Sequence, residues 1–186
     1  MSTKVMRLTL FSICLLLVGC AHRSLPVLGD VPAFELTDQL GRTFSSTSSL
    51  SGHVWVADFV FTNCEGPCPR MSSHMHALQS KTDAAIRLVS FTVDPKRDTP
   101  EVLNEYSKKF GVDIARWSFL TGPVPTLNAL DEKAFKLGTI GDEIEHSTRF
   151  ALVDKKGHIR GYYGLSDGNP EDKIAKDAAT LEEEPS

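Results

Sequence analysis

Apolar and polar residues alternate near residue 34, and this pattern predicts a β-hairpin. Residues 34–38 alternate in hydropathy, Gln39-Leu40-Gly41 has the composition of a turn, and residues 42–44 lead back along the first strand. Predominantly apolar runs at 54–61 and 86–93 then predict two buried strands. The chain therefore starts with a half-exposed hairpin and continues into elements covered on both faces.

Helical periodicity fills the intervals after these strands. Apolar residues recur every three or four positions in the segments 71–78, 103–110, 127–137 and 174–181. Thr99 and Pro100 suit the N-cap and the first position of the second helix. Further apolar segments predict a third buried strand at 117–120 and a closing hairpin at 150–153 and 158–163.

Strands that alternate with helices imply βαβ units around a central sheet. We therefore expect an α/β chain with a thioredoxin-like fold. It would have a central mixed sheet flanked by helices, an N-terminal β-hairpin and an inserted helix. A length of 186 residues fits one such domain.

The first residues have the features of a secretory signal peptide. Lys4 and Arg7 precede an apolar stretch at 8–18, and the segment 1–19 ends at a cysteine. Leu-Val-Gly-Cys at 17–20 resembles the bacterial lipobox, which implies that Cys20 becomes the acylated N-terminus. An uncleaved membrane helix is the alternative, but the stretch is shorter than the ~20 residues that a bilayer needs.

This interpretation divides the chain into three parts and places it outside the cytoplasm. Residues 20–30 would be a lipidated tether, and residues 31–186 a folded domain of the thioredoxin-like class. Loss of residues 1–19 removes two positive charges and takes the net charge from −4 to −6. So acidic a domain offers no electrostatic surface for nucleic acid. The acidic end of the chain, 182–186, is expected to be solvated.

Two of the four cysteines remain in the secreted domain, and both lie between a strand and a helix. Cys64 and Cys68 follow the apolar run at 54–61, where the start of a helix favours a thiolate at Cys64. A dithiol at such a turn is typical of thioredoxin-like redox proteins, and in an oxidising compartment the pair could form a disulfide. Two thiolates together with an imidazole, such as that of His146, would instead suit copper(I).

Several motifs in order resemble the Sco/SenC family of copper proteins. They occupy residues 58–69, 91–100, 117–122, 146–157 and 161–163. The resemblance implies one copper ion, as Cu(I) with Cu(II) as a second form, held by Cys64, Cys68 and His146. It also implies a role in assembling the dinuclear copper site of cytochrome c oxidase, by copper delivery or by reduction of the target's cysteines. Asp94 matches a family aspartate thought to act near the metal.

Other interpretations remain open at this point. Cys64 and Cys68 could be the redox pair of a membrane-anchored thiol-disulfide oxidoreductase or, more remotely, belong to a peroxidase-like protein. Glu65 stands where the family often has proline. Its carboxylate disfavours a thiolate at the neighbouring Cys64 and bears on which target protein the site recognises. Met71 and Met75 fit core packing better than copper binding, and His74 and His76 are expected to face solvent. The partner would be the copper-site subunit of the oxidase or another extracytoplasmic copper protein. The chain itself is expected to be a monomer.

Overall fold

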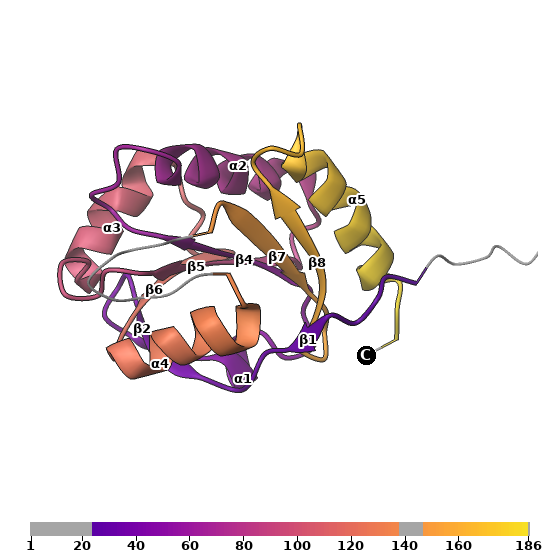
Figure 1. Ribbon diagram of the computed structural model, residues 1–186, viewed down its shortest axis with the longest axis horizontal. Helices are drawn as coiled ribbons and strands as arrows, with labels where there is room; N and C mark the ends of the chain where they lie inside the picture. Colours follow the sequence, from indigo (N-terminus) through magenta and orange to yellow (C-terminus); the bar gives the residue numbers. More distant parts are fainter. Residues whose placement is uncertain (1–23, 138–146, 186) are drawn as a thin grey trace, which may run out of the picture.

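The computed structural model describes residues 24–137 and 147–185, which fold around one eight-stranded mixed sheet (Figure 1). The strand order across the sheet is β1-β8-β7-β4-β5-β6-β2-β3. The strands are β1 (Gly29–Asp30), β2 (Glu35–Asp38), β3 (Thr43–Ser45), β4 (Trp55–Val60), β5 (Arg87–Thr92), β6 (Trp117–Thr121), β7 (Arg149–Val153) and β8 (His158–Gly164). The helices are α1 (Ser46–Ser49), α2 (Cys68–Lys81), α3 (Pro100–Lys109), α4 (Val124–Asn128), η1 (Ala129–Phe135) and α5 (Pro170–Glu182).

The centre of the sheet consists of parallel strands with antiparallel strands on both sides. β4 pairs in parallel with β5, and β5 with β6, through the βα connections that the sequence predicts. β7 runs antiparallel to β4, and β8 and β1 continue the sheet on that side. The predicted N-terminal hairpin, β2 and β3, joins the other side through β6. The expected mixed sheet with flanking helices is confirmed.

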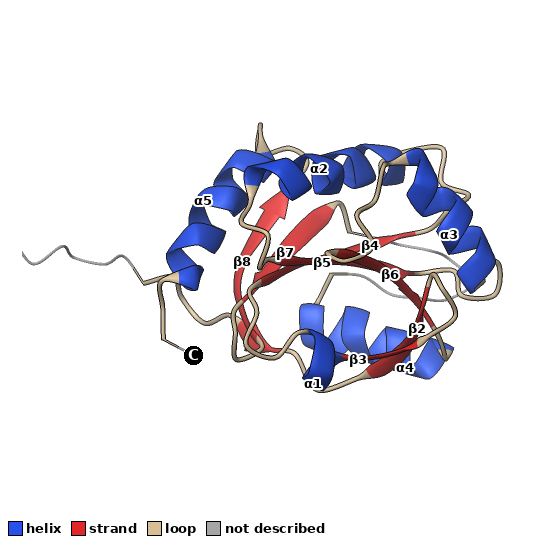
Figure 2. Ribbon diagram, turned by 180° about the vertical axis from the view of Figure 1, so that it is seen from behind, coloured by secondary structure: helices blue, strands red, loops and turns tan. Residues whose placement is uncertain are grey.

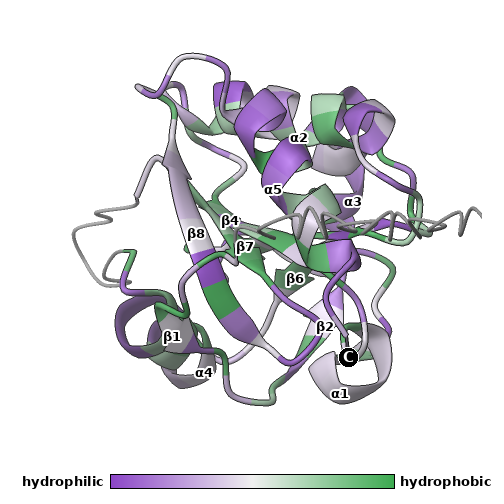
Figure 3. Cartoon of the chain, turned by 90° about the vertical axis from the view of Figure 1, so that its right-hand side faces the viewer, coloured by the Kyte–Doolittle hydropathy of each residue, from purple (hydrophilic) through white to green (hydrophobic). Residues whose placement is uncertain are grey.

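Helices cover both faces of the sheet and enclose two apolar layers (Figures 1 and 2). α2, α3 and α5 cover one face, where the predicted core residues Met71 and Met75 are fully buried. α1, α4 and η1 cover the other face. The central strands β4, β6 and β7 carry strongly apolar segments between these layers (Figure 3).

Two elements differ from the pattern-based expectation. The polar connection after β3 contains a short helix, α1, whose Ser46 side chain accepts a hydrogen bond from the Phe34 amide at 2.9 Å. The inserted helix begins as α4 and continues as a π-helix, η1, which ends at Lys136 with a φ of 54°. The wider π turn changes which side chains face the sheet, and a period of 3.6 residues cannot anticipate it.

A buried arginine ties both ends of the described chain to the sheet. The Arg160 guanidinium donates to the Leu25 carbonyl at 2.6 Å and to the carboxylates of Asp154 at 2.8 Å and Glu184 at 2.7 Å. The side chain of Arg160 is only 6% exposed, so its charge needs these acceptors. The acidic tail is therefore partly bound to the domain, contrary to the expectation that it is solvated.

Phe135 should be a major contributor to stability. Its ring is fully buried and lies 5.9 Å from the ring of Trp55, 5.5 Å from that of Phe59 and 5.8 Å from that of Phe91. Phe135→Ala would leave a cavity among these rings, and we expect the free energy of unfolding to fall by about 3–5 kcal/mol. Urea denaturation measures this loss. Ile114→Ala, at a 54% exposed position, should change stability by less than about 0.5 kcal/mol.

Candidate metal centre

The two cysteines lie at the carboxyl end of β4, where the chain turns into α2. Cys64 is half-buried in the connecting loop, and Cys68 is fully buried as the first residue of α2. Pro67 precedes the helix and Pro69 lies in its first turn, where a missing amide proton has no cost. The strand-to-helix placement expected from the sequence is therefore present.

The two thiols are close enough to interact directly. Burial raises the pKa of Cys68 most, and a hydrogen bond with the Cys64 side chain raises it further. A backbone hydrogen bond from Phe61 acts in the opposite direction. The start of a helix favours a thiolate, but here the lack of solvent outweighs it. Cys68 is thus held as a neutral thiol next to Cys64.

A buried carboxyl group lies in the same layer, between the sheet and α2. Asp58 on β4 is fully buried, and burial raises its pKa from 3.8 to about 7. One oxygen accepts a hydrogen bond from Ser90 at 2.5 Å, and Ser90 in turn accepts one from the Trp117 indole at 3.0 Å. The other oxygen, Oδ2, has no partner among the described residues. Its charge also helps to raise the pKa of Cys68.

A second buried carboxylate fixes the start of the cysteine loop. Asp98 is fully buried and accepts hydrogen bonds from the Thr62 hydroxyl at 2.6 Å, the Thr62 amide at 3.2 Å and the Thr92 hydroxyl at 2.6 Å. Thr62 lies two residues before Cys64. Asp98 therefore connects the cysteine loop to the end of β5.

The family motif points to Asp94, and not to Asp98, for a role near the metal. Asp94 forms an ion pair with Arg97, and its amide donates to the Thr92 hydroxyl at 2.9 Å. Asp94 therefore joins the same network through Thr92. The position of Asp98, just before the N-cap Thr99, gave no sign that its side chain would reach across to Thr62.

His146 and Cys20 lie outside the described residues. Within the described ranges, no three histidine, cysteine, aspartate or glutamate side chains are grouped as a metal site would require, so Cys64 and Cys68 supply two sulfur ligands at most. Across those same ranges, every helix is too short or too polar to cross a bilayer.

The histidines on α2 have separate surroundings. His76 is exposed, as expected. His74 is half-buried instead: its Nδ1 lies 2.7 Å from Glu171 on α5, and its ring packs edge-on against Phe150. His74 therefore links α2 to α5, because the predicted solvent face of α2 is covered there by the last helix.

The fold and the paired thiols agree with comparisons to known proteins. The SCO1/SenC family model matches residues 29–182, nearly all of the described domain. The SCO1 protein homolog of Bacillus subtilis is 35% identical over 187 residues, covering 94% of this chain and 96% of the relative. The chain belongs to the Sco/SenC family, and its fold is thioredoxin-like.

Solved structures give the same result. A SCO1/SenC family lipoprotein from Bacillus anthracis superposes with a TM-score of 0.76 at 34% identity, covering 83% of this chain and 96% of that one. BsSco, described as a member of the Sco family of cytochrome c oxidase assembly proteins with a disulfide switch, gives 0.75 at 33% identity, with coverages of 84% and 96%. Yeast Sco1 with copper bound gives 0.66 at 27% identity, with coverages of 83% and 90%.

Asp58 should make stability fall as the pH rises. Its folded pKa of about 7 exceeds the usual 3.8, so the native state binds its proton more tightly than the unfolded chain does. The contribution is complete below pH 4 and is lost as the pH rises through 7, a change of roughly 4 kcal/mol. In Asp58→Asn this part of the pH dependence should disappear, which denaturation at a series of pH values would show. An unchanged pH profile would contradict the assignment.

Asp131→Asn provides a matched control. Asp131 is also buried, with a pKa raised to about 7 by burial, but on the opposite side of the sheet in η1. Both variants should therefore flatten the pH profile of stability. Only Asp58→Asn should lower the pKa of Cys68, measured from the ultraviolet absorbance of the thiolate, because of these two carboxyl groups Asp58 alone raises the pKa of that thiol.

Proposed function

We propose that this chain is a copper-binding Sco protein that assists assembly of the dinuclear copper site of cytochrome c oxidase. The observation that carries the proposal is the pair of adjacent thiols, Cys64 and Cys68, at the carboxyl end of β4 in a Sco fold. Two sulfur ligands held close together suit a soft ion such as copper(I). The copper-bound structure of yeast Sco1, with the same fold, supports copper as the cargo.

His146 is the proposed third ligand. β7 runs antiparallel to β4, so the chain enters β7 at the end of the sheet where β4 leads to Cys64. His146 comes three residues before Arg149, the first residue of β7. The strand order therefore favours an imidazole near the two sulfurs. One imidazole nitrogen and two soft thiolate sulfurs would give a three-coordinate copper(I) site.

Thiol-disulfide exchange is the second candidate function of the same pair. The hydrogen bond between Cys64 and Cys68 brings the sulfurs to a separation from which a disulfide could form, and BsSco is described as having a disulfide switch. In this case the protein would reduce the cysteines of its target copper protein. Dithiol exchange needs no third ligand, so His146 separates the two functions.

We further propose that the mature protein is a lipoprotein outside the cytoplasm, anchored through Cys20. The lipobox at 17–20 and the related lipoprotein from Bacillus anthracis support this. The expected partner is the copper-site subunit of the oxidase or another extracytoplasmic copper protein.

An anaerobic Cu(I) titration of the reduced full-length protein in a non-ionic detergent, competed against a calibrated chelator, tests the copper site. We expect one tightly bound equivalent, and binding weaker by roughly 10- to 100-fold in His146→Ala because one of three ligands is lost. His76→Ala, which removes an exposed imidazole from α2, is the control and should bind as the unmodified protein does.

The other outcomes are informative as well. Tight binding that does not depend on His146 would mean a simple dithiol, and the oxidoreductase function would be favoured. Absence of tight binding would refute the copper proposal, and the reduction potential of the Cys64–Cys68 pair would then be the property to measure.

Asp98 should support the site without binding the metal. Asp98→Asn removes the carboxylate that holds Thr62 and Thr92, so the cysteine loop loses its fixed start. We expect Cu(I) affinity to fall roughly 10-fold or more, as is typical when a group behind a ligand is removed. Asp94→Asn should have a smaller effect, since the Asp94 side chain pairs with Arg97 and it is the backbone amide, unchanged in this variant, that bonds Thr92. Equal affinities in Asp98→Asn and the unmodified protein would exclude this positioning role.

A further inference from the structure

A polar cavity of about 470 Å³ lies far from the cysteines, and its lining is rich in arginine. We call it the arginine pocket, after Arg42, Arg87 and Arg116. His53 and the hydroxyl side chains of Thr43, Ser48, Ser49 and Ser118 complete its polar lining. Asp38 is the only carboxylate among the described lining residues. The pocket therefore has two excess positive charges in a chain whose net charge is −4.

The Asp38 carboxylate accepts its hydrogen bonds from residues of its own turn. Asp38 accepts hydrogen bonds from the amides of Leu40 and Arg42 at 2.9 and 2.8 Å, and from Nε and Nη2 of Arg42 at 2.8 and 2.7 Å. The Arg42 side chain nevertheless stays 64% exposed. Arg42 is thus oriented by Asp38 and still accessible to a ligand.

Arg116 is held in place by neutral acceptors. Its guanidinium donates to the carbonyls of Gln79 at 2.6 Å and Asp83 at 2.7 Å, and to the Thr82 hydroxyl at 2.9 Å. These bonds fix the group without cancelling its charge. Burial lowers the pKa of Arg116 most, and the positive charge of Arg87 lowers it further, against the opposing carboxylates of Asp113 and Asp83.

Arg87 is the least constrained of the three cations. Its Nη1 donates a hydrogen bond to the Ala84 carbonyl at 3.2 Å. Arg87 begins β5 and Arg116 directly precedes β6, and the Leu88 amide donates to the Arg116 carbonyl at 2.8 Å. An anion near these two guanidinium groups would relieve their repulsion. It would accept its charge-assisted hydrogen bonds mainly from Arg87, because the Arg116 nitrogens already donate to the end of α2 and the loop after it.

Strand register places this pocket at the end of the sheet where the N-terminal segment leaves the domain. Ile159, Val153, Trp55 and Arg87 occupy neighbouring positions across β8, β7, β4 and β5. The Leu28 amide donates to the Ile159 carbonyl at 2.8 Å. The cysteines lie beyond Val60 at the opposite end, about 17 Å along β4 from Trp55.

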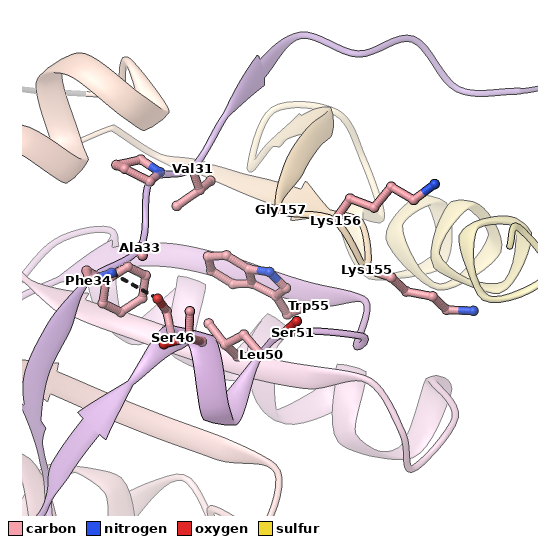
Figure 4. A pocket seen from close by; sticks show the side chains of 12 residues that line it. Val31, Ala33, Phe34, Ser46, Leu50, Ser51, Trp55, Lys155, Lys156 and Gly157 are labelled. Atoms are coloured by element: carbon pink, nitrogen blue, oxygen red, sulfur yellow. Dashed lines mark hydrogen bonds between the residues drawn. The ribbon is translucent and has the colours of Figure 1, made fainter. Parts of the chain in front are cut away.

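A second cavity, of about 230 Å³, adds positive charge at the same end (Figure 4). Leu50 lines both cavities, and Lys155 and Lys156 line this one beside Trp55, with their side chains directed away from the indole. The Lys155 ammonium group donates a hydrogen bond to the Glu182 carbonyl at 2.6 Å, whereas the Lys156 side chain is exposed. From Cys20 to Ser24 the chain can extend at most about 14 Å. An acyl anchor at Cys20 would therefore keep this end of the domain near the bilayer.

We propose that the arginine pocket binds a phosphate group, either the headgroup phosphate of an anionic lipid or inorganic phosphate. Guanidinium groups bind phosphate oxygens in a fork geometry, and the surrounding hydroxyls can donate to the remaining oxygens. The site is independent of the proposed copper function. Only the lipid as its source rests on the proposed anchor at Cys20.

Isothermal titration of the full-length protein in a non-ionic detergent tests the pocket. The probes are inorganic phosphate, dihexanoyl-phosphatidylglycerol and dihexanoyl-phosphatidylcholine. We expect binding that weakens with added salt and falls at least tenfold in Arg87→Gln. Arg42→Gln is a second variant on another element, so that misfolding of one cannot decide the result. Arg149→Gln removes the same charge from an exposed position at the cysteine end and should leave binding unchanged.

The probes also identify the source of the phosphate. Tighter binding of phosphatidylglycerol than of inorganic phosphate would support a lipid headgroup, and the reverse would support free phosphate. The proposal would be overturned if neither phosphatidylglycerol nor inorganic phosphate bound. It would also be overturned if Arg149→Gln lost as much binding affinity as Arg87→Gln. Cu(I) titration of Arg87→Gln should match the unmodified protein, so failure of the pocket and failure of the copper site are separately visible.

Discussion

Parallel pairing of β4 with β5 is the constraint on which the candidate site depends. It brings the carboxyl ends of both strands to one edge, so that the loop with Cys64 leaves the sheet next to the turn with Asp94 and Asp98. The antiparallel pairing of β7 brings the segment before Arg149 to the same edge. Three segments far apart in the sequence meet there, as is usual for sites at the carboxyl ends of parallel strands.

Burial then determines the chemistry at that edge. Cys68 and Asp58 lie in the same solvent-free layer, and each holds its proton more strongly than it would in water. Under the copper proposal, the metal would have to displace the thiol protons, above all the tightly held proton of Cys68. The pair would therefore favour an ion that binds sulfur strongly. Asp98 is buried too, but donors from Thr62 and Thr92 surround it and make its carboxylate a fixed attachment point.

The two ends of the sheet have different tasks under these proposals. The cysteine end presents the thiols to a partner. The opposite end holds the N-terminal segment through Arg160 and carries the arginine pocket. A domain attached at one end and reactive at the other would present its site away from the bilayer surface, where an extracytoplasmic partner domain could reach it.

Sequence patterns alone determined the order of the longer strands and helices, because periodicity and capping are local properties; the short elements β1 and α1 were not predicted. The buried strands, the Thr99 N-cap and the two methionines of α2 were all predictable in this way. The ordered motifs also pointed to the Sco/SenC family, and the family match confirms it. The role of His146 as a ligand stays a prediction.

Long-range contacts depend on the tertiary structure, and no local pattern contains them. Asp98 reaches Thr62 across 36 residues, Arg160 reaches Leu25 across 135, and the arginine pocket collects side chains from several separate segments. The π turn of η1 is also decided by packing against the sheet. A chain's hydropathy determines which residues are buried, but only the strand register decides which buried or charged groups become neighbours.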